Sequence, residues 1–198
     1  VSLGLVDTKN KQKWLFEASP DIATQLADLA QNHLKTGTLI DGIFLTHAHI
    51  GHYTGLMYFG REAFGKKGTK VFAMPKMITY LTKNGPWSQL VELENIVFEK
   101  LQNEATIVLN TQLKVTPFIV PHRDEFSETV GYKIEGENKT ALFIPDINKW
   151  QKWQKNIVAE VKKVDYAFLD ATFFKDGEIK RPMSEIPHPF IEETVHLF

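Results

Sequence analysis

The chain has 198 residues, 43% of them hydrophobic, and this suits one domain with a sizeable core. Its 23 basic and 24 acidic side chains are mixed along the sequence, without the basic excess typical of a dedicated nucleic-acid or membrane-surface binder. There is no cysteine, which excludes disulfides, thiolate nucleophiles and cysteine-ligated metal sites, so any metal must be held by histidines and carboxylates.

The first half of the sequence predicts alternating strands and helices. Residues 2–19 place two apolar runs around a polar turn, which is typical of a β-hairpin. Ser19 and Pro20 suit the N-cap and first helical position of a helix that should end near Gly37. The elements expected next are a strand at 39–45, a helix at 54–64 closed by Gly65, a strand at 70–74 and a helix at 75–81.

Strands dominate the middle of the chain, and helices return near its end. The amphipathic stretch 150–163 predicts a helix, because Trp150, Trp153, Ile157 and Val161 recur at spacings of three and four. Five strands are expected before it and one strand and one helix after it: 94–101, 105–110, 112–121, 128–136, 139–146, 164–174 and a helix from Ile191. This pattern favours a layered α/β architecture in which helices cover sheets.

Three histidines gather directly after the predicted strand 39–45. His47, His49 and His52 lie within six positions. Neutral imidazole is the commonest side-chain metal ligand, and two histidines separated by one residue on a loop can turn toward one ion. His52 would approach the same cavity as a ligand of a second ion. The alternative is three solvated loop histidines.

Two later strands end in residues that could complete such a site. His122 follows the strand 112–121, and Asp146 ends the strand 139–146. Strand ends supply ligands on a rigid scaffold, although a single aspartate there is also a common turn former and a single histidine a common surface residue. His33 and His196 stand without such neighbours and are interpreted as structural.

These residues resemble a known family. The stretch HAHIGH resembles the His-x-His-x-Asp-His motif of the metallo-β-lactamase superfamily, with His122 matching its later lone histidine and Asp146 its metal-bridging aspartate. Four further stretches resemble the pyrroloquinoline quinone biosynthesis protein B group and ribonuclease Z-like phosphodiesterases: PHRDEFSETVGYKI, ALFIPDI, VDYAFLDATFF and MSEIPHP. The resemblance implies a single α/β domain over residues 1–198 with an αββα four-layer sandwich and a metal site at one edge of its two sheets.

The resemblance also implies which residues bind metal. His47, His49 and His122 would hold a first ion, and His52 with a bridging Asp146 would hold a second. Gly51 stands where the motif has its aspartate, and the family's final histidine has no match before Phe198. One firmly held ion is therefore expected rather than two. Zinc is favoured by the histidines, while manganese or iron also suits histidine with a carboxylate.

A second pair carries the expected catalytic chemistry. Asp170 resembles the acid that ribonuclease Z-like enzymes supply, and His188 the histidine that pairs with it. In such enzymes the pair protonates a leaving oxygen. Asp146 could orient or deprotonate the metal-activated water. The alternatives are an aspartate that closes a strand and a histidine that caps the last helix.

The sequence therefore predicts a metal-dependent hydrolase that acts on an ester. Phosphodiester, thioester and lactone stay open, and a small phosphodiester is favoured because no Lys/Arg-rich arm could hold a long nucleic acid. One alternative is an iron-dependent oxidative enzyme of the pyrroloquinoline quinone biosynthesis type. The other is a non-catalytic binding module with a degenerate metal site, which Gly51 would favour.

The expected location and partners are inferred from features that the sequence lacks. No apolar run reaches the length of a membrane span, and no basic region followed by an apolar stretch opens the chain, so we expect a cytoplasmic protein without a membrane partner. A homodimer stays open. The chain begins at Val1 inside a predicted strand and ends at Phe198 inside a predicted helix, which suggests a domain excerpt or a trimmed product.

Overall fold

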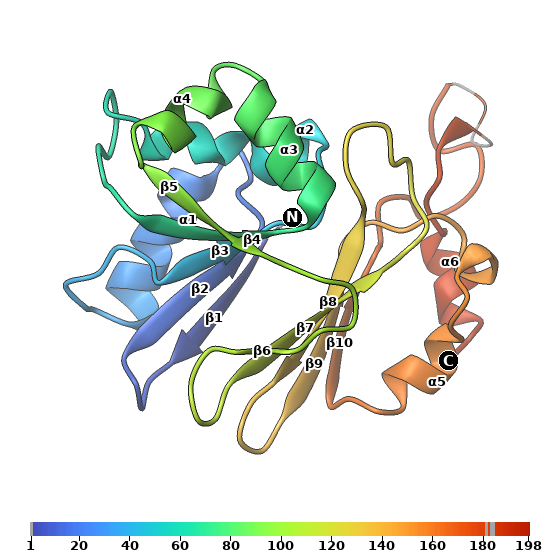
Figure 1. The fold of residues 1–198 in the computed structure, drawn as a ribbon. Coiled ribbons are helices and arrows are strands. Elements are labelled where there is room, and N and C mark those ends of the chain that lie inside the picture. The colour runs from blue at the N-terminus through green and yellow to red at the C-terminus, as the bar shows by residue number, and fades with distance from the viewer. Residues whose placement is uncertain (1, 181, 183–184) are drawn as a thin grey trace. The chain divides into compact units, whose positions relative to one another are not determined.

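The computed structural model describes residues 2–180, 182 and 185–198 (Figure 1). Met183 and Ser184, from the stretch MSEIPHP, lie outside these residues. The chain forms two compact units, one made of residues 1–101 with 126–128 and the other of residues 102–125 with 129–198. Each unit contains one five-stranded sheet. The single domain over residues 1–198 stays a prediction.

The sheet of the first unit is mixed, with its strands in sequence order. β1 pairs with β2 antiparallel, which confirms the predicted hairpin, and β2 to β5 run parallel to one another. Its strands are β1 (Leu3–Asp7), β2 (Gln12–Phe16), β3 (Gly42–Phe44), β4 (Thr69–Ala73) and β5 (Ile96–Lys100). The carboxyl ends of four strands therefore lie at one edge, where loops can bring distant residues together.

Helices cover one face of this sheet, and aromatic rings occupy the other. On the helical side, Leu15 and Ile43 pack in one core with Met77 and other helix residues. On the opposite side the rings of Phe16, Phe44 and Phe72 stack in a row across β2, β3 and β4, with centroids 4.8 and 4.2 Å apart. The helical segments are α1 (Ile22–Asp28), η1 (Leu29–His33), α2 (Ile50–Tyr53), η2 (Thr54–Phe59), α3 (Pro75–Lys83) and α4 (Trp87–Glu92).

Three details of the first unit differ from the sequence prediction. The first helix starts two residues later than expected, because the Ser19 hydroxyl accepts a hydrogen bond from the Gln25 side chain and caps no backbone N–H. The helix expected at 54–64 is instead α2 followed by the 3-10 turn η2, which ends at Phe59. The short helix α4 was not predicted.

Gly55 explains why this region turns tightly. Its N–H donates to the Ala18 carbonyl at 2.9 Å, and a Cβ built on it would lie 2.1 Å from the Ser19 carbonyl oxygen. The Gly55→Ala substitution should therefore destabilise the protein by about 2–3 kcal/mol, since two backbone segments must separate. Chemical denaturation measures this. Gly37→Ala is the matched control, because nothing lies within 4 Å of its Cβ; equal midpoints for the two variants would contradict the close approach.

The sheet of the second unit is also mixed. β6 to β9 pair antiparallel in sequence order, and β10 pairs with β9 in parallel. Its strands are β6 (Ile107–Val108), β7 (Lys114–Ile119), β8 (Val130–Glu135), β9 (Thr140–Ile144) and β10 (Tyr166–Leu169). Since β7, β9 and β10 run in the same direction, their carboxyl ends lie at one edge.

The helical layer of the second unit is shorter than predicted. The continuous helix expected at 150–163 is wrong: the turn η3 (Trp150–Lys152) and α5 (Ile157–Val161) are separate, and Trp153 between them is extended. The Trp153 indole N–H donates to the Ile119 carbonyl at 3.0 Å, and the Asn156 side chain caps α5. The helix predicted from Ile191 is confirmed as α6 (Ile191–Val195), whose N-terminal Phe190 N–H donates to Glu193.

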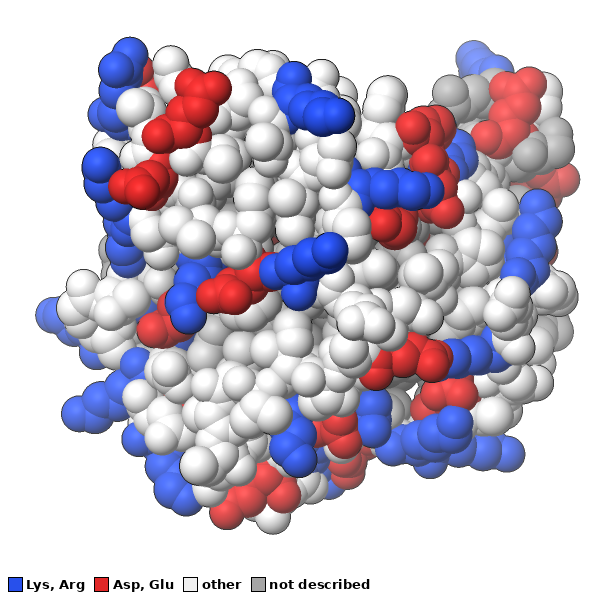
Figure 2. Space-filling model, in the orientation of Figure 1, with Lys and Arg blue, Asp and Glu red and all other residues white. Residues whose placement is uncertain are grey.

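Charged side chains of both signs are interspersed on the face drawn in Figure 2. Figure 2 shows Lys and Arg beside Asp and Glu, and short ion pairs occur in each unit, such as Lys70–Glu99 at 3.5 Å and Lys139–Asp165 at 2.7 Å. Among the described helices, none combines the length and the apolar character that crossing a membrane requires.

Candidate metal centre

The histidine loop leaves the sheet of the first unit beside the end of β2. Phe16 of β2 and Phe44 of β3 are register partners in parallel strands, so the residues that follow them emerge at the same edge. Backbone hydrogen bonds fasten the two segments together: Glu17 N–H donates to the Phe44 carbonyl and Ala18 N–H to the His52 carbonyl, both at 2.8 Å. These backbone hydrogen bonds therefore fix the position of the loop that carries the histidines.

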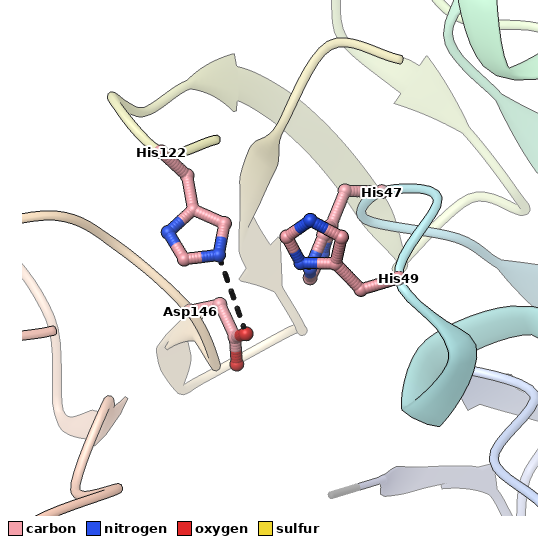
Figure 3. A group of neighbouring side chains, drawn as sticks. All are labelled: His47, His49, His122 and Asp146. Carbon is pink, nitrogen blue, oxygen red and sulfur yellow. Dashed lines mark hydrogen bonds and ion pairs between the residues drawn. The ribbon is translucent and has the colours of Figure 1, made fainter. Parts of the chain in front are cut away.

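The rings of the three loop histidines lie against one another. His47 Nε2 and His49 Nδ1 are 2.8 Å apart, and their rings meet edge to face, as Figure 3 shows. The rings of His47 and His52 have centroids 4.2 Å apart. His47 is 1% exposed and His52 is 9% exposed. The alternative of three solvated loop histidines is therefore wrong for His47 and His52.

A carboxylate that sequence reasoning missed belongs to this cluster. Glu17 is 0% exposed, and one ligand atom each from Glu17, His47 and His52 lie within 4.8 Å of one another. Its Oε1 lies 3.2 Å from His52 Nδ1 and also accepts a hydrogen bond from the Thr46 hydroxyl. Its position directly after the apolar run of β2, with no polar neighbour in sequence, was the only signal available.

His122 and Asp146 meet within the second unit. They follow β7 and β9, whose carboxyl ends share an edge, and Asn148 N–H donates to the Pro121 carbonyl at 2.6 Å between the two loops. His122 Nε2 lies 3.6 Å from Asp146 Oδ2, the contact dashed in Figure 3. The His122 side chain is fully buried, and that of Asp146 is 13% exposed. The two predicted strand-end ligands are therefore neighbours.

Asp170 and His188 form a buried pair, close to Asp146. His188 Nδ1 lies 2.6 Å from Asp170 Oδ2, which also accepts the Ile147 N–H at 3.1 Å. Asp170 Oδ1 accepts from the Thr172 N–H at 3.1 Å and hydroxyl at 2.7 Å. One ligand atom each from Asp146, Asp170 and His188 lie within 4.8 Å of one another. Both carboxylate oxygens of Asp170 therefore accept hydrogen bonds, and the carboxylate fixes the orientation of the His188 imidazole.

Tyr53, next to His52, is held neutral. Burial, together with the Tyr80 hydroxyl 2.8 Å away, raises the pKa of the Tyr53 phenol well above its usual range. The phenol therefore carries its proton at any physiological pH and can act as a hydrogen-bond donor but not as a base.

Comparison with known proteins places the chain in a family. The model of the β-lactamase superfamily domain matches residues 12–198. The chain belongs to the metallo-β-lactamase superfamily. Among solved structures it is similar to zinc-bound PqqB from Methylobacterium extorquens, with a TM-score of 0.77, 20% identity, and coverage of 96% of this chain and 68% of PqqB. No curated protein matches it in sequence.

Two further superfamily structures share the fold. Human tRNase Z, short form, has a TM-score of 0.63 and 16% identity over 98% of this chain and 80% of its own. A diphosphatase from the PhnP family has a TM-score of 0.60 and 21% identity over 94% of this chain and 64% of its own. The family model and these likenesses confirm the predicted fold class, to which each unit contributes one mixed sheet with its helices.

Proposed function

We propose that this superfamily member is a metal-dependent hydrolase whose first ion is held by His47, His49, His122 and Asp146. The observation that carries the proposal is the convergence of His47 Nε2 and His49 Nδ1 at 2.8 Å on a loop held at the sheet edge. It is supported by a second pair of donors within the second unit, His122 Nε2 and Asp146 Oδ2, which lie 3.6 Å apart. The match to the β-lactamase superfamily domain over residues 12–198 also favours a hydrolase.

The donor set fits a divalent transition metal. Two nitrogens at about 2.0–2.1 Å from zinc in tetrahedral geometry lie about 3.4 Å apart. The 2.8 Å and 3.6 Å separations of the two donor pairs lie on either side of that value. Zinc suits imidazole and carboxylate together, as do manganese and iron. His52 and Asp146 would hold a second ion only weakly, because Gly51 supplies no carboxylate.

The chemistry proposed for the site is attack of water on an ester. A divalent ion held there would supply a water of lowered pKa and a positive charge for the developing oxyanion. Asp146 would orient that water and accept its proton. Asp170 holds the proton of His188 on Nδ1, which leaves Nε2 as the atom that exchanges a proton with the leaving oxygen.

A small phosphodiester is the proposed substrate class. The tRNase Z and diphosphatase named among the similar structures favour phosphate chemistry. On the face drawn in Figure 2, Lys and Arg side chains stand among Asp and Glu, and the sequence has 23 basic and 24 acidic side chains, so we expect a small substrate rather than a long nucleic acid.

The proposal is tested with protein purified without chelator. We expect bound transition metal by mass spectrometry, and hydrolysis of bis(p-nitrophenyl) phosphate that a chelator abolishes and added zinc or manganese restores. Absence of bound metal, with no uptake of zinc, manganese or iron, would overturn the proposal. Metal binding without any turnover of phosphodiester, thioester or lactone substrates would point instead to a binding module.

A rival function has one observation in its favour. The likeness to PqqB has the highest TM-score among the structures compared above, 0.77, and a site of histidines and carboxylate also suits iron. An iron-dependent oxidative enzyme would consume oxygen when loaded with ferrous iron and would leave phosphodiesters intact with zinc or manganese. That pair of results would replace the hydrolase proposal.

A further inference from the structure

The segment 126–128 belongs to the first unit, where it is fastened to the histidine loop. The Ser127 hydroxyl accepts a hydrogen bond from the Ala48 N–H at 2.8 Å, and Ser127 is 2% exposed. Ala48 is the residue between His47 and His49. The hydrogen bond therefore joins the segment to the loop at the point between two of the proposed metal ligands.

Helix α3 holds the same segment at two points, one helical turn apart. The Glu128 carboxylate accepts the Lys76 N–H at 3.0 Å, at the beginning of α3. The ring of Phe126 packs against the ring of Tyr80, with centroids 5.4 Å apart. Residues 76 and 80 are four apart in sequence and so share one face of the helix. The backbone of the segment and one side of the Phe126 ring are therefore fixed in position.

Tyr80 connects the Phe126 ring to the histidine loop a second time. The Tyr80 hydroxyl lies 2.8 Å from the hydroxyl of Tyr53, which directly follows His52 in the chain. Tyr53 is 3% exposed, and its ring also packs against the ring of Trp87, with centroids 5.0 Å apart. Packed aromatic side chains next to the loop therefore support Phe126 from one side.

Two large apolar side chains are nevertheless exposed in this region. Phe126 is 58% exposed, and Ile50, which directly follows His49, is 72% exposed. A single exposed apolar side chain is ordinary in a folded protein. Phe126 differs from that case, because hydrogen bonds hold its segment on both the helix and the loop while its ring stays open to solvent. A rigid aromatic ring beside a candidate site is typical of a ligand-binding surface.

We propose that Phe126 determines substrate specificity, by stacking its exposed side on an aromatic ring that one ester group of the phosphodiester carries. This inference rests on the proposed function and narrows its substrate class to phosphodiesters with an aromatic or heteroaromatic group, such as a nucleobase. Stacking on a phenyl ring tolerates any aromatic face, so it selects rings against alkyl groups but does not select one base from another. The Cα of Phe126 is about 3.8 Å from that of Ser127, which binds the loop between His47 and His49.

Calorimetry on zinc-loaded protein tests the proposal with two ligands, dibenzylphosphinate and dipropylphosphinate. In both of them CH₂ groups replace the ester oxygens of a diester, so neither can be hydrolysed. We expect the unmodified chain to bind dibenzylphosphinate about tenfold more tightly than dipropylphosphinate. Phe126→Ala should abolish this preference by weakening the binding of dibenzylphosphinate alone. Phe126→Tyr should keep the preference, because it keeps the ring.

Two further variants separate stacking from general effects. Phe126→Leu keeps an apolar side chain without a ring and should lose the preference. Phe64→Ala is the matched control, because Phe64 is a 40% exposed phenylalanine of the same unit that packs against Tyr58 and Phe59; both affinities should be unchanged. A preference that persists in Phe126→Ala or Phe126→Leu would overturn the proposal, and so would an equal loss in Phe64→Ala.

Failure of this inference is distinguishable from failure of the proposed function. If the unmodified chain hydrolyses phosphodiesters but binds the two phosphinates equally well, the inference is overturned and the proposed function stands. If the chain binds no metal or hydrolyses no ester, the proposed function fails. In that case a preference for dibenzylphosphinate that Phe126→Ala removes would still support an aromatic ligand at Phe126, and equal binding would overturn the inference as well.

Discussion

His47→Ala should reduce zinc affinity by more than about 100-fold, since loss of a ligand costs more than loss of the hydrogen-bond partner behind one. His49→Ala should do the same, because His49 Nδ1 lies 2.8 Å from His47 Nε2 and would bind the same ion. Neither change should unfold the protein, because the loop stays fastened by the Glu17 and Ala18 backbone hydrogen bonds. Zinc titration calorimetry on metal-free protein measures the affinities.

His33→Ala is the control for these two variants. His33 lies at the end of η1, its side chain is 56% exposed, and it pairs with Asp28 at 3.3 Å. Its removal takes away one imidazole of the same chemistry, and zinc affinity should not change. Equal metal binding by all three variants would contradict the ligand assignment, and so would equal loss in all three.

His188→Ala should lower kcat by about 10²–10⁴-fold while leaving bound metal unchanged, because its imidazole is proposed to protonate the leaving oxygen and not to bind the ion. The effect should depend on the leaving group. A phosphodiester with an alkoxide leaving group needs that proton, whereas a nitrophenolate leaves without one. Steady-state kinetics with the two substrate types should therefore show a large loss for the alkyl ester and a small one for the nitrophenyl ester.

Two further variants make this experiment more specific. Asp170→Asn should reproduce the same dependence on leaving group, since the 2.6 Å contact to His188 Nδ1 fixes the imidazole. His196→Ala is the control, because His196 is an exposed residue at the end of α6 whose Nδ1 donates to the Glu192 carbonyl. Equal losses with both leaving groups would contradict the proton-donor role, and loss of metal from His188→Ala would make that residue a ligand.

Most strands could be predicted from sequence, and the helices less well. The strands follow from short apolar runs between turn residues, a local property. The helix expected at 150–163 was wrong because the Trp153 indole bonds the Ile119 carbonyl, a contact across 34 residues that interrupts an otherwise helical spacing. Likewise, the 3-10 turn after His52 reflects the close approach of Gly55 to Ser19, which no local pattern reveals.

The residues of the candidate site were likewise predicted only in part. Spacing alone indicated His47, His49 and His52, and strand ends indicated His122 and Asp146. Glu17 was missed because its partners Thr46 and His52 lie 29 and 35 residues further along the chain, and a single glutamate at a strand end carries no signal of its own.

A crystal structure with anomalous scattering collected at the metal edge tests the central claim most directly. We predict one strong peak about 2.0–2.1 Å from His47 Nε2, His49 Nδ1 and His122 Nε2, with an oxygen of Asp146 beside it, and a weak peak or none at His52. A density map of metal-loaded protein with no peak at these histidines, or with the peak elsewhere, would contradict the claim.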